Sequence, residues 1–150
     1  MKTKNWLIVL TIIIIVGAAY FVIKNRSKVT YTSAQYGYAI DISKDLKYQE
    51  FNQADGSGVG LLITNPSLTS PGAQVSINVM ARNNGGSAGV DSTLNGLPAK
   101  VWTGQGGGSQ GNSTVKTYQI VHNNKVYDIN IIPADDSVFQ AVADTFRFIE

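Results

Sequence analysis

An uncharged run of 18 residues near the N-terminus, from Trp6 to Ile23, constrains this chain more than any other feature. As an α-helix rising about 1.5 Å per residue, the run would extend roughly 27 Å, close to the hydrocarbon thickness of a bilayer. Trp6 and Tyr20 lie near its two ends, where aromatic side chains suit the membrane interfaces. The sequence therefore predicts a transmembrane helix at residues 6–23, preceded by a short basic N-terminus at residues 1–5.

A cleaved signal peptide is the alternative interpretation of the same segment. The small residues at 17–19 (Gly-Ala-Ala) would form its cleavage site. The apolar run continues beyond them through Tyr20–Ile23, however, and is closed by Lys24, Arg26 and Lys28. A longer apolar segment with a basic flank is typical of a stop-transfer sequence, so we expect an uncleaved single-pass anchor.

The basic residues are concentrated around this segment. Residues 1–28 hold five of the twelve Lys and Arg and no acid, whereas residues 29–150 hold seven basic and ten acidic residues. No basic stripe interleaved with aromatics is present, so we expect no nucleic-acid partner. The flanking charges are nearly balanced and do not orient the segment. The Lys-poor, amide- and hydroxyl-rich composition that follows favours an extracytoplasmic C-terminal domain at the cell membrane.

After a polar stalk at residues 24–35, the dominant pattern is an alternation of apolar and polar residues, which predicts half-buried strands. We expect strands at residues 36–42, 47–51, 59–63, 75–79, 97–103, 115–122 and 125–132. The hairpin around Asn123 and Asn124 is the clearest, because both residues tolerate the positive φ of a type I′ turn. A two-residue turn there pairs Ile120 with Tyr127 and places the apolar residues of both strands on one face.

One soluble helix is expected near the C-terminus. Asp135 or Asp136 can cap a helix that begins after Pro133. Its apolar positions are Val138, Phe139, Val142 and Ala143, and Phe146 and Phe148 then share one side of an extended end at residues 145–149. The predicted fold class is α+β, with an antiparallel sheet of six or seven strands packed against the helix in a single domain at residues 36–150.

Several classes of chemistry are disfavoured by composition. The chain has no Cys and one His, which excludes a disulfide scaffold, Cys-based metal sites and a thiol nucleophile. Residues 106–111 match G-x-G-x-x-G, but a strand rather than a helix is expected after them, so we interpret them as a loop. We interpret His122 as a turn residue and the pair Asp135 and Asp136 as a helix cap rather than a cation site. No catalytic, cofactor or metal residue is predicted.

Trp102 is the only candidate for partner binding. In the strand at residues 97–103, Ala99 and Val101 share one face and Lys100 and Trp102 the other. If Val101 faces the core, Trp102 points away from it, beside the Gly-rich loop at residues 104–111, where an exposed Trp would be a good anchor for a partner. A second layer over that face would instead make Trp102 a core residue, which is the interpretation we favour because large aromatics are mostly buried.

Three segments resemble the PsbP/Mog1-like superfamily. The superfamily's opening strand and turn resemble the segment Tyr36-Gly-Tyr-Ala-Ile-Asp-Ile-Ser-Lys-Asp-Leu46 of this chain. Its closing helix, followed by Thr-Phe-x-Phe, resembles residues 138–149. Asn95-Gly-Leu-Pro-Ala99 resembles the start of its Asn-Gly strand. The resemblance implies an antiparallel sheet sandwiched with helices, and an accessory or binding role like that of photosystem assembly factors, a GTPase-binding protein and many anchored bacterial proteins. The matching residues are structural, so no site residue carries over.

These observations favour a non-catalytic, membrane-anchored, extracytoplasmic protein that binds a protein or cell-envelope partner. A pilin-like structural subunit would also join an apolar N-terminal helix to a β-rich head. The chain lacks the Gly-terminated leader and the acidic residue that such a subunit would carry. A hydrolase using a Ser and His122 is the remaining alternative, but no G-x-S-x-G motif supports it.

Overall fold

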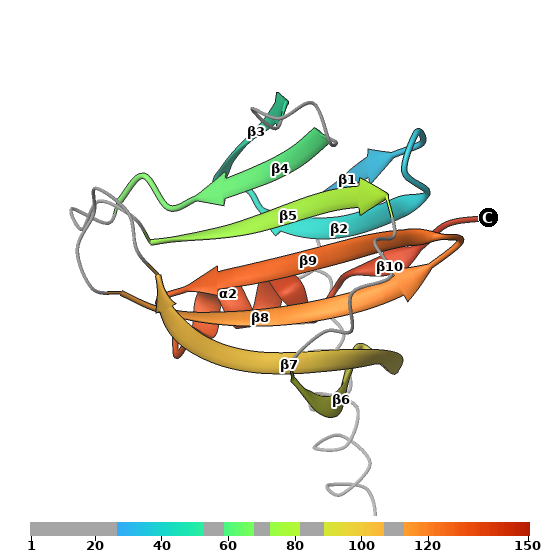
Figure 1. Ribbon diagram of the computed structural model, residues 1–150. Coiled ribbons are helices and arrows are strands. Elements are labelled where there is room, and N and C mark those ends of the chain that lie inside the picture. Colours follow the sequence, from blue (N-terminus) through green and yellow to red (C-terminus); the bar gives the residue numbers. More distant parts are fainter. Residues whose placement is uncertain (1–26, 53–58, 68–72, 82–88, 107–112) are drawn as a thin grey trace, which may run out of the picture.

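A computed structural model describes residues 27–52, 59–67, 73–81, 89–106 and 113–150. These residues form two antiparallel sheets and one short helix (Figure 1). The larger sheet has seven strands in the order β3-β4-β5-β9-β8-β7-β6, and the smaller has three in the order β1-β2-β10. The strands of the larger sheet are β3 (Lys47–Asn52), β4 (Val59–Thr64), β5 (Gln74–Ala81), β6 (Val90–Leu94), β7 (Leu97–Gly106), β8 (Ser113–His122) and β9 (Lys125–Ile132).

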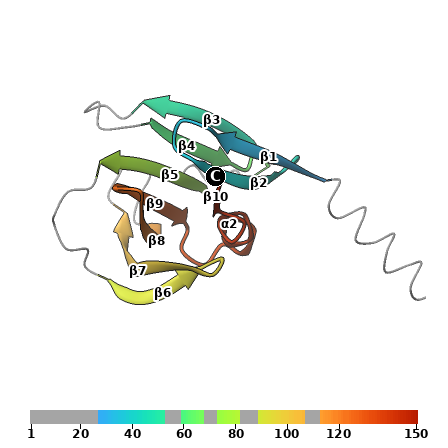
Figure 2. The ribbon, with the colours of Figure 1, turned by 90° about the vertical axis from the view of Figure 1, so that its right-hand side faces the viewer.

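The smaller sheet and the helix cover one face of the larger sheet. The elements of this layer are β1 (Lys28–Ser33), β2 (Tyr38–Ser43), β10 (Arg147–Phe148) and α2 (Ser137–Ala143). Figure 2 shows the larger sheet curling around α2, which packs against β2, β5 and β9. We call the covered face of the larger sheet the inner face and the opposite face the outer face.

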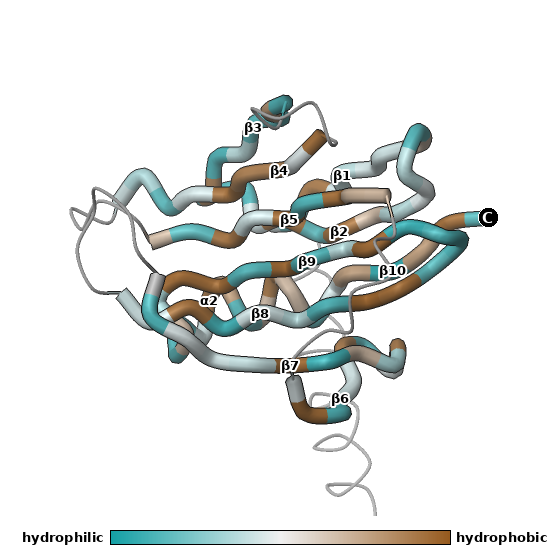
Figure 3. The backbone as a smooth tube through the Cα atoms, in the orientation of Figure 1, coloured by the Kyte–Doolittle hydropathy of each residue, from teal (hydrophilic) through white to brown (hydrophobic). Residues whose placement is uncertain are grey.

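The core lies between these two layers and follows from the period-two pattern. In β5, Val75, Ile77 and Val79 are fully buried, while the residues between them are half-buried on the outer face. Figure 3 shows the same alternation of hydrophobic and hydrophilic residues along β8 and β9. Strands β5, β9 and β8 are neighbours in the larger sheet, so their inner-face side chains form one continuous core.

The hairpin of β8 and β9 confirms the sequence-based register. Ile120 pairs with Tyr127 and Tyr118 pairs with Ile129. Asn123 and Asn124 have φ values of 47° and 59°, as a type I′ turn requires.

The sequence-based prediction underestimates the number of strands and starts the folded domain too late. The described residues form ten strands, whereas the sequence predicts six or seven. Residues 28–33, which belong to the predicted polar stalk, form β1 and pair with β2 along its whole length. Most β1 side chains are exposed, so the segment lacks a clear apolar alternation. Strand β6 was missed for the same reason, because Leu94 is its only buried residue.

Aromatic rings join the two layers. Tyr127 of the larger sheet meets Tyr38 edge-on at 6.2 Å and Phe148 edge-on at 5.0 Å between ring centroids. The Tyr127 hydroxyl donates a hydrogen bond of 2.7 Å to the Tyr36 carbonyl, which satisfies the polar end of a buried side chain. Burial raises the pKa of Tyr38 and of Tyr127 above the ordinary tyrosine value.

Helix α2 confirms the predicted cap and most of the predicted apolar face. The Asp136 carboxylate accepts hydrogen bonds from the backbone N–H groups of Val138 and Phe139. Phe139, Val142 and Ala143 are buried. Val138 is 48% exposed, so the prediction that it belongs to the core-facing side is wrong.

The end of the chain is tied to β2 by a polar network. The Thr145 hydroxyl accepts a hydrogen bond from the Asp41 N–H at 2.9 Å, and Arg147 forms an ion pair with the Asp41 carboxylate at 3.0 Å. Burial alone would raise the pKa of Asp41, but hydrogen bonds from Arg147 and Thr30 and the nearby charges of Arg147 and Lys28 lower it below the ordinary value. Phe146 and Phe148 lie on one side of this segment, as expected, and their rings contact at 5.4 Å.

The predicted membrane segment at residues 6–23 lies outside the described residues. In the part of the chain that the structure describes, no helix has the length and apolar character needed to cross a membrane.

Candidate functional site

The outer face of the larger sheet carries two neighbouring rows of polar side chains. The cross-strand register aligns Asp91, Lys100, Gln119, Asp128 and Asn78 in one row across five strands. The next row along the strands is formed by Trp102, Thr117, Asn130 and Ser76. Successive residues on one face of a strand are about 7 Å apart, so the two rows lie side by side.

Trp102 belongs to this outer face and not to the core. The side chain is half-buried, whereas Val101 next to it packs against the core. The favoured sequence-based interpretation of Trp102 as a core residue is therefore wrong. The strand alternation was assigned correctly, but the smaller sheet and α2 cover only the inner face, on which Trp102 does not lie.

Glycines make room for two aromatic rings on the outer face. A Cβ built on Gly89 would lie 3.2 Å from Cε3 of Trp102, so the indole ring rests against the Gly89 backbone. At the other end of the sheet, a Cβ on Gly60 would lie 2.2 Å from Cζ of Phe51, its cross-strand partner. Both rings therefore lie close to a glycine backbone, Phe51 in β3 at one end of the face and Trp102 in β7 toward the other.

Cross-strand hydrogen bonds hold the polar rows in place. The Thr117 hydroxyl donates to Oδ1 of Asn130 at 2.8 Å, and Nδ2 of Asn130 donates to the Ser76 hydroxyl at 3.3 Å. In the neighbouring row, Nε2 of Gln119 donates to the Asp128 carboxylate at 2.9 Å. Because each amide is fixed by a partner on the next strand, its remaining polar atoms are presented in a defined direction.

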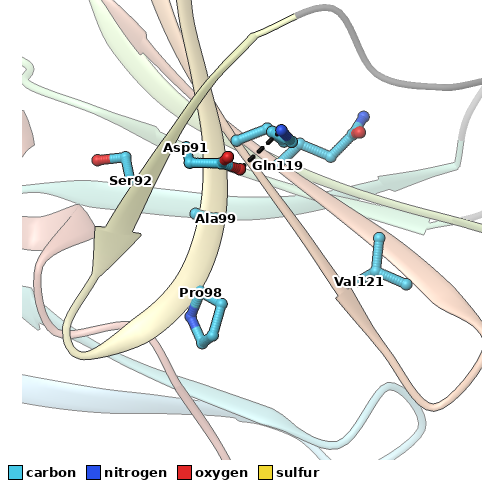
Figure 4. Close-up of a pocket in the computed structure, with 7 residues that line it drawn as sticks. Asp91, Ser92, Pro98, Ala99, Gln119 and Val121 are labelled. Carbon is cyan, nitrogen blue, oxygen red and sulfur yellow. Dashed lines mark ion pairs between the residues drawn. The ribbon is translucent and has the colours of Figure 1, made fainter.

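A hollow of about 420 Å³ lies beside these rows at the β6 end of the sheet (Figure 4). We call it the outer groove; its lining residues are Asp91, Ser92, Pro98, Ala99, Lys100, Gln119 and Val121. Figure 4 shows Asp91, whose ion pair with Lys100 is dashed, beside Gln119 at one end, with Pro98 and Val121 toward the other. The volume falls within the range of small-ligand sites.

The groove lining holds one ion pair, and a half-buried carboxylate lies next to it. Lys100 Nζ lies 2.6 Å from the Asp91 carboxylate, although the Asp91 side chain is 90% exposed, so the pair contributes little to stability. Asp128 lies next to Gln119 and is more enclosed. Burial raises the pKa of Asp128 above the ordinary aspartate value, and the hydrogen bond from Gln119 lowers it only in part.

We expect Asp128→Asn to stabilise the fold at neutral pH. A raised pKa in the folded state means that folding disfavours the ionised carboxylate, so this penalty is present at neutral pH and disappears when the pH falls below about 4. Asn retains an oxygen that can accept the Gln119 hydrogen bond. The urea midpoint of the variant should exceed that of the wild type at pH 7, with the difference vanishing at pH 3.

Asp91→Asn is the matched control for that measurement, because it removes the same charge from an exposed position. Its midpoint should stay close to that of the wild type at both pH values. A lower midpoint for Asp128→Asn at pH 7 would show that the ionised carboxylate favours the folded state.

The structure also places His122, Asp135 and Asp136, the other residues considered as candidates in the sequence analysis. The His122 ring stacks on Phe148 with ring centroids 3.8 Å apart, and within the described residues it forms no hydrogen bond with a carboxylate or hydroxyl. Asp136 caps α2, and Asp135 precedes it. Among the residues that the structure describes, no three His, Cys, Asp or Glu side chains are grouped to hold a metal ion. Residues 107–111 of the G-x-G-x-x-G match lie outside the described part.

Sequence reasoning found Trp102 but missed the groove beside it. The missing element is β6, which supplies Asp91 and Ser92. A usable signal was present in Asn95 and Gly96, whose φ values of 49° and 77° fit a hairpin turn between β6 and β7. An Asn-Gly pair before a predicted strand indicates a preceding partner strand even where that partner is polar.

Comparison with known proteins identifies the fold. No family model matches the chain, and no curated protein sequence matches it. The chain is similar to the solution structure of cyanobacterial PsbP (CyanoP) from Synechocystis sp. PCC 6803, with a TM-score of 0.60 and 10% identity over 81% of this chain and 92% of that one. It is also similar to a crystal structure from Bacteroides thetaiotaomicron VPI-5482, with a TM-score of 0.59 and 13% identity over 83% of this chain.

The aligned region covers 49% of the Bacteroides protein, so the chain spans about half of its length. At these identities the likeness concerns the fold alone. The domain has a PsbP-like fold, in agreement with the resemblance in the sequence, and its described residues form mostly sheet with one short helix.

Proposed function

We propose that this chain is a non-catalytic binding or accessory protein, anchored in the cell membrane by residues 6–23, with its C-terminal domain outside the cytoplasm. The observation that carries the proposal is the outer groove with Trp102 beside it. A concave site with a few fixed polar groups and a partly accessible Trp has the composition of a recognition site.

The non-catalytic part of the proposal is supported by the place of the titratable groups. His122 is held by stacking on Phe148, and Asp136 is engaged in capping α2. Lys100 is paired with Asp91 at the surface. Each of these side chains has a structural partner that accounts for its position, which favours binding over acid–base catalysis.

The anchoring part is supported by the uncharged run at residues 6–23 and by the basic residues on both sides of it. Strand β1 begins at Lys28, so only a few residues would separate the membrane from the folded domain. The domain would then act close to the membrane surface, which suits an accessory role in the cell envelope.

A photo-crosslinking experiment on the full chain tests the binding site. A photoreactive amino acid replaces Val121 in the groove, which is 49% exposed, or Val29 in β1, which is 39% exposed and serves as the control. Illumination of intact cells should give a covalent higher-mass species at position 121 and none at position 29. Equal labelling at both positions, or none at either, would contradict the proposed binding site.

Protease treatment of intact spheroplasts tests the topology of the same protein. We expect the domain to be digested while a cytosolic marker survives. Protection of the domain until the membrane is permeabilised would place it on the cytoplasmic side and contradict the proposed orientation.

A further inference from the structure

The ligand class can be inferred from the surface that Trp102 presents. The indole ring rests against the Gly89 backbone on one side and keeps part of its surface accessible, so it forms a platform on the outer face. The neighbouring strand holds Thr117 opposite Trp102, and Gln119 lies one step along the same face. A flat aromatic next to fixed polar side chains suits a ligand that has an apolar face and a polar edge.

The polar atoms available beside Trp102 are neutral donors and acceptors. An amide offers two N–H donors and one oxygen acceptor. Within the described residues, Gln119 uses one N–H, toward Asp128, and Asn130 uses its oxygen and one N–H, toward Thr117 and Ser76. Each amide therefore retains capacity for a ligand hydroxyl or amide while its orientation is already fixed, which lowers the entropy lost on binding.

The paired charges of the groove lining favour a neutral ligand at this surface. The one basic residue of the groove lining, Lys100, is neutralised by Asp91 at 2.6 Å, so phosphate and other anions find no free cation there. The lining also mixes Pro98 and Val121 with polar groups and has no deep apolar pocket for a lipid chain. A neutral ligand rich in hydroxyl groups fits both the ring and the amides.

We propose that the outer groove and the Trp102 surface beside it bind a neutral oligosaccharide, with the Trp102 ring stacking on a sugar ring and Gln119 hydrogen-bonding its polar groups. This inference rests on the proposed binding function and specifies the chemistry of its ligand. For a domain held at the outer side of a membrane, such a ligand is a glycan of the cell envelope.

Fluorescence of the full chain tests the inference directly. The chain has two tryptophans, so the full-length Trp6→Phe variant in detergent micelles or vesicles reports on Trp102 alone. The probes are the tetramers of β-1,4-linked N-acetylglucosamine and of β-1,4-linked glucose. We expect at least one of them to change the Trp102 emission saturably, with a Kd of about 1 mM or below.

Calorimetric titration of variants assigns the effect to the groove. Trp102→Ala and Gln119→Ala should each weaken binding of the tetramer by about tenfold or more. Phe51→Ala is the matched control, because Phe51 lies over Gly60 on the same face at the far end of the sheet, and it should leave the affinity unchanged. Urea midpoints of all variants identify any that have lost the fold, and Trp102→Tyr, which retains an aromatic ring, should retain most of the affinity.

The inference is overturned if neither tetramer binds at about 10 mM, or if Phe51→Ala weakens binding as much as Trp102→Ala. If crosslinking at Val121 captures a protein while both sugars fail to bind, the groove is a protein-binding site; the proposed function then stands and the oligosaccharide inference falls. If neither crosslinking nor sugar binding is observed, both fail.

Discussion

Phe146→Ala should lower the free energy of unfolding by about 3–5 kcal/mol, the usual cost of truncating a large aromatic in a core. The Phe146 side chain is fully buried, stacks on Tyr38 at 5.3 Å and contacts Tyr127 at 6.0 Å between ring centroids. Its carbonyl also accepts a hydrogen bond from Nδ2 of Asn95, in the turn before β7. Removing the ring leaves a cavity beside Tyr38 and Tyr127 that the surrounding side chains fill only in part.

Urea unfolding of the purified protein measures this change. Val138→Ala, in the same C-terminal segment but 48% exposed, is the control and should cost less than about 1 kcal/mol. An equally small loss for Phe146→Ala would mean that the C-terminal segment contributes little to the core.

Removal of β1 should destabilise the domain by at least about 3 kcal/mol, since two aromatic contacts and a ladder of backbone hydrogen bonds are lost together. Tyr31 in this strand lies 6.0 Å from Tyr38 and 5.6 Å from Tyr48 between ring centroids. The Tyr31 hydroxyl donates a hydrogen bond to Glu50; burial and this contact raise the pKa of Tyr31 to about 12. The strand therefore connects the edge of the smaller sheet to β3.

The measurement compares fragments 27–150 and 36–150, the second of which begins at the boundary suggested by the sequence. The longer fragment should unfold in one cooperative thermal transition, and the shorter one should show a much lower midpoint or none. Tyr31→Ala in the longer fragment should give an intermediate loss, because it removes the ring contacts and keeps the strand. Equal stability of the two fragments would show that the folded domain starts after β1.

The sequence by itself determined the local elements whose signals are complete within a short stretch. The register of the β8–β9 hairpin follows from a two-residue turn at Asn123 and Asn124, and the buried faces of β5, β8 and β9 follow from period two. The start of α2 follows from Asp136, because a helix N-terminus needs an acceptor for its free N–H groups. These features depend on neighbours in sequence, so they required no knowledge of the tertiary structure.

Only the tertiary structure decided which strands join which sheet and which faces are covered. The β1 sequence shows no clear alternation, because an edge strand with exposed side chains is stabilised mainly by its partner. The face shared by Lys100 and Trp102 was assigned correctly, but its exposure depends on where α2 and the smaller sheet pack. The outer groove depends on β6, β7 and β8 meeting in one sheet, a contact between segments distant in sequence that no local pattern specifies.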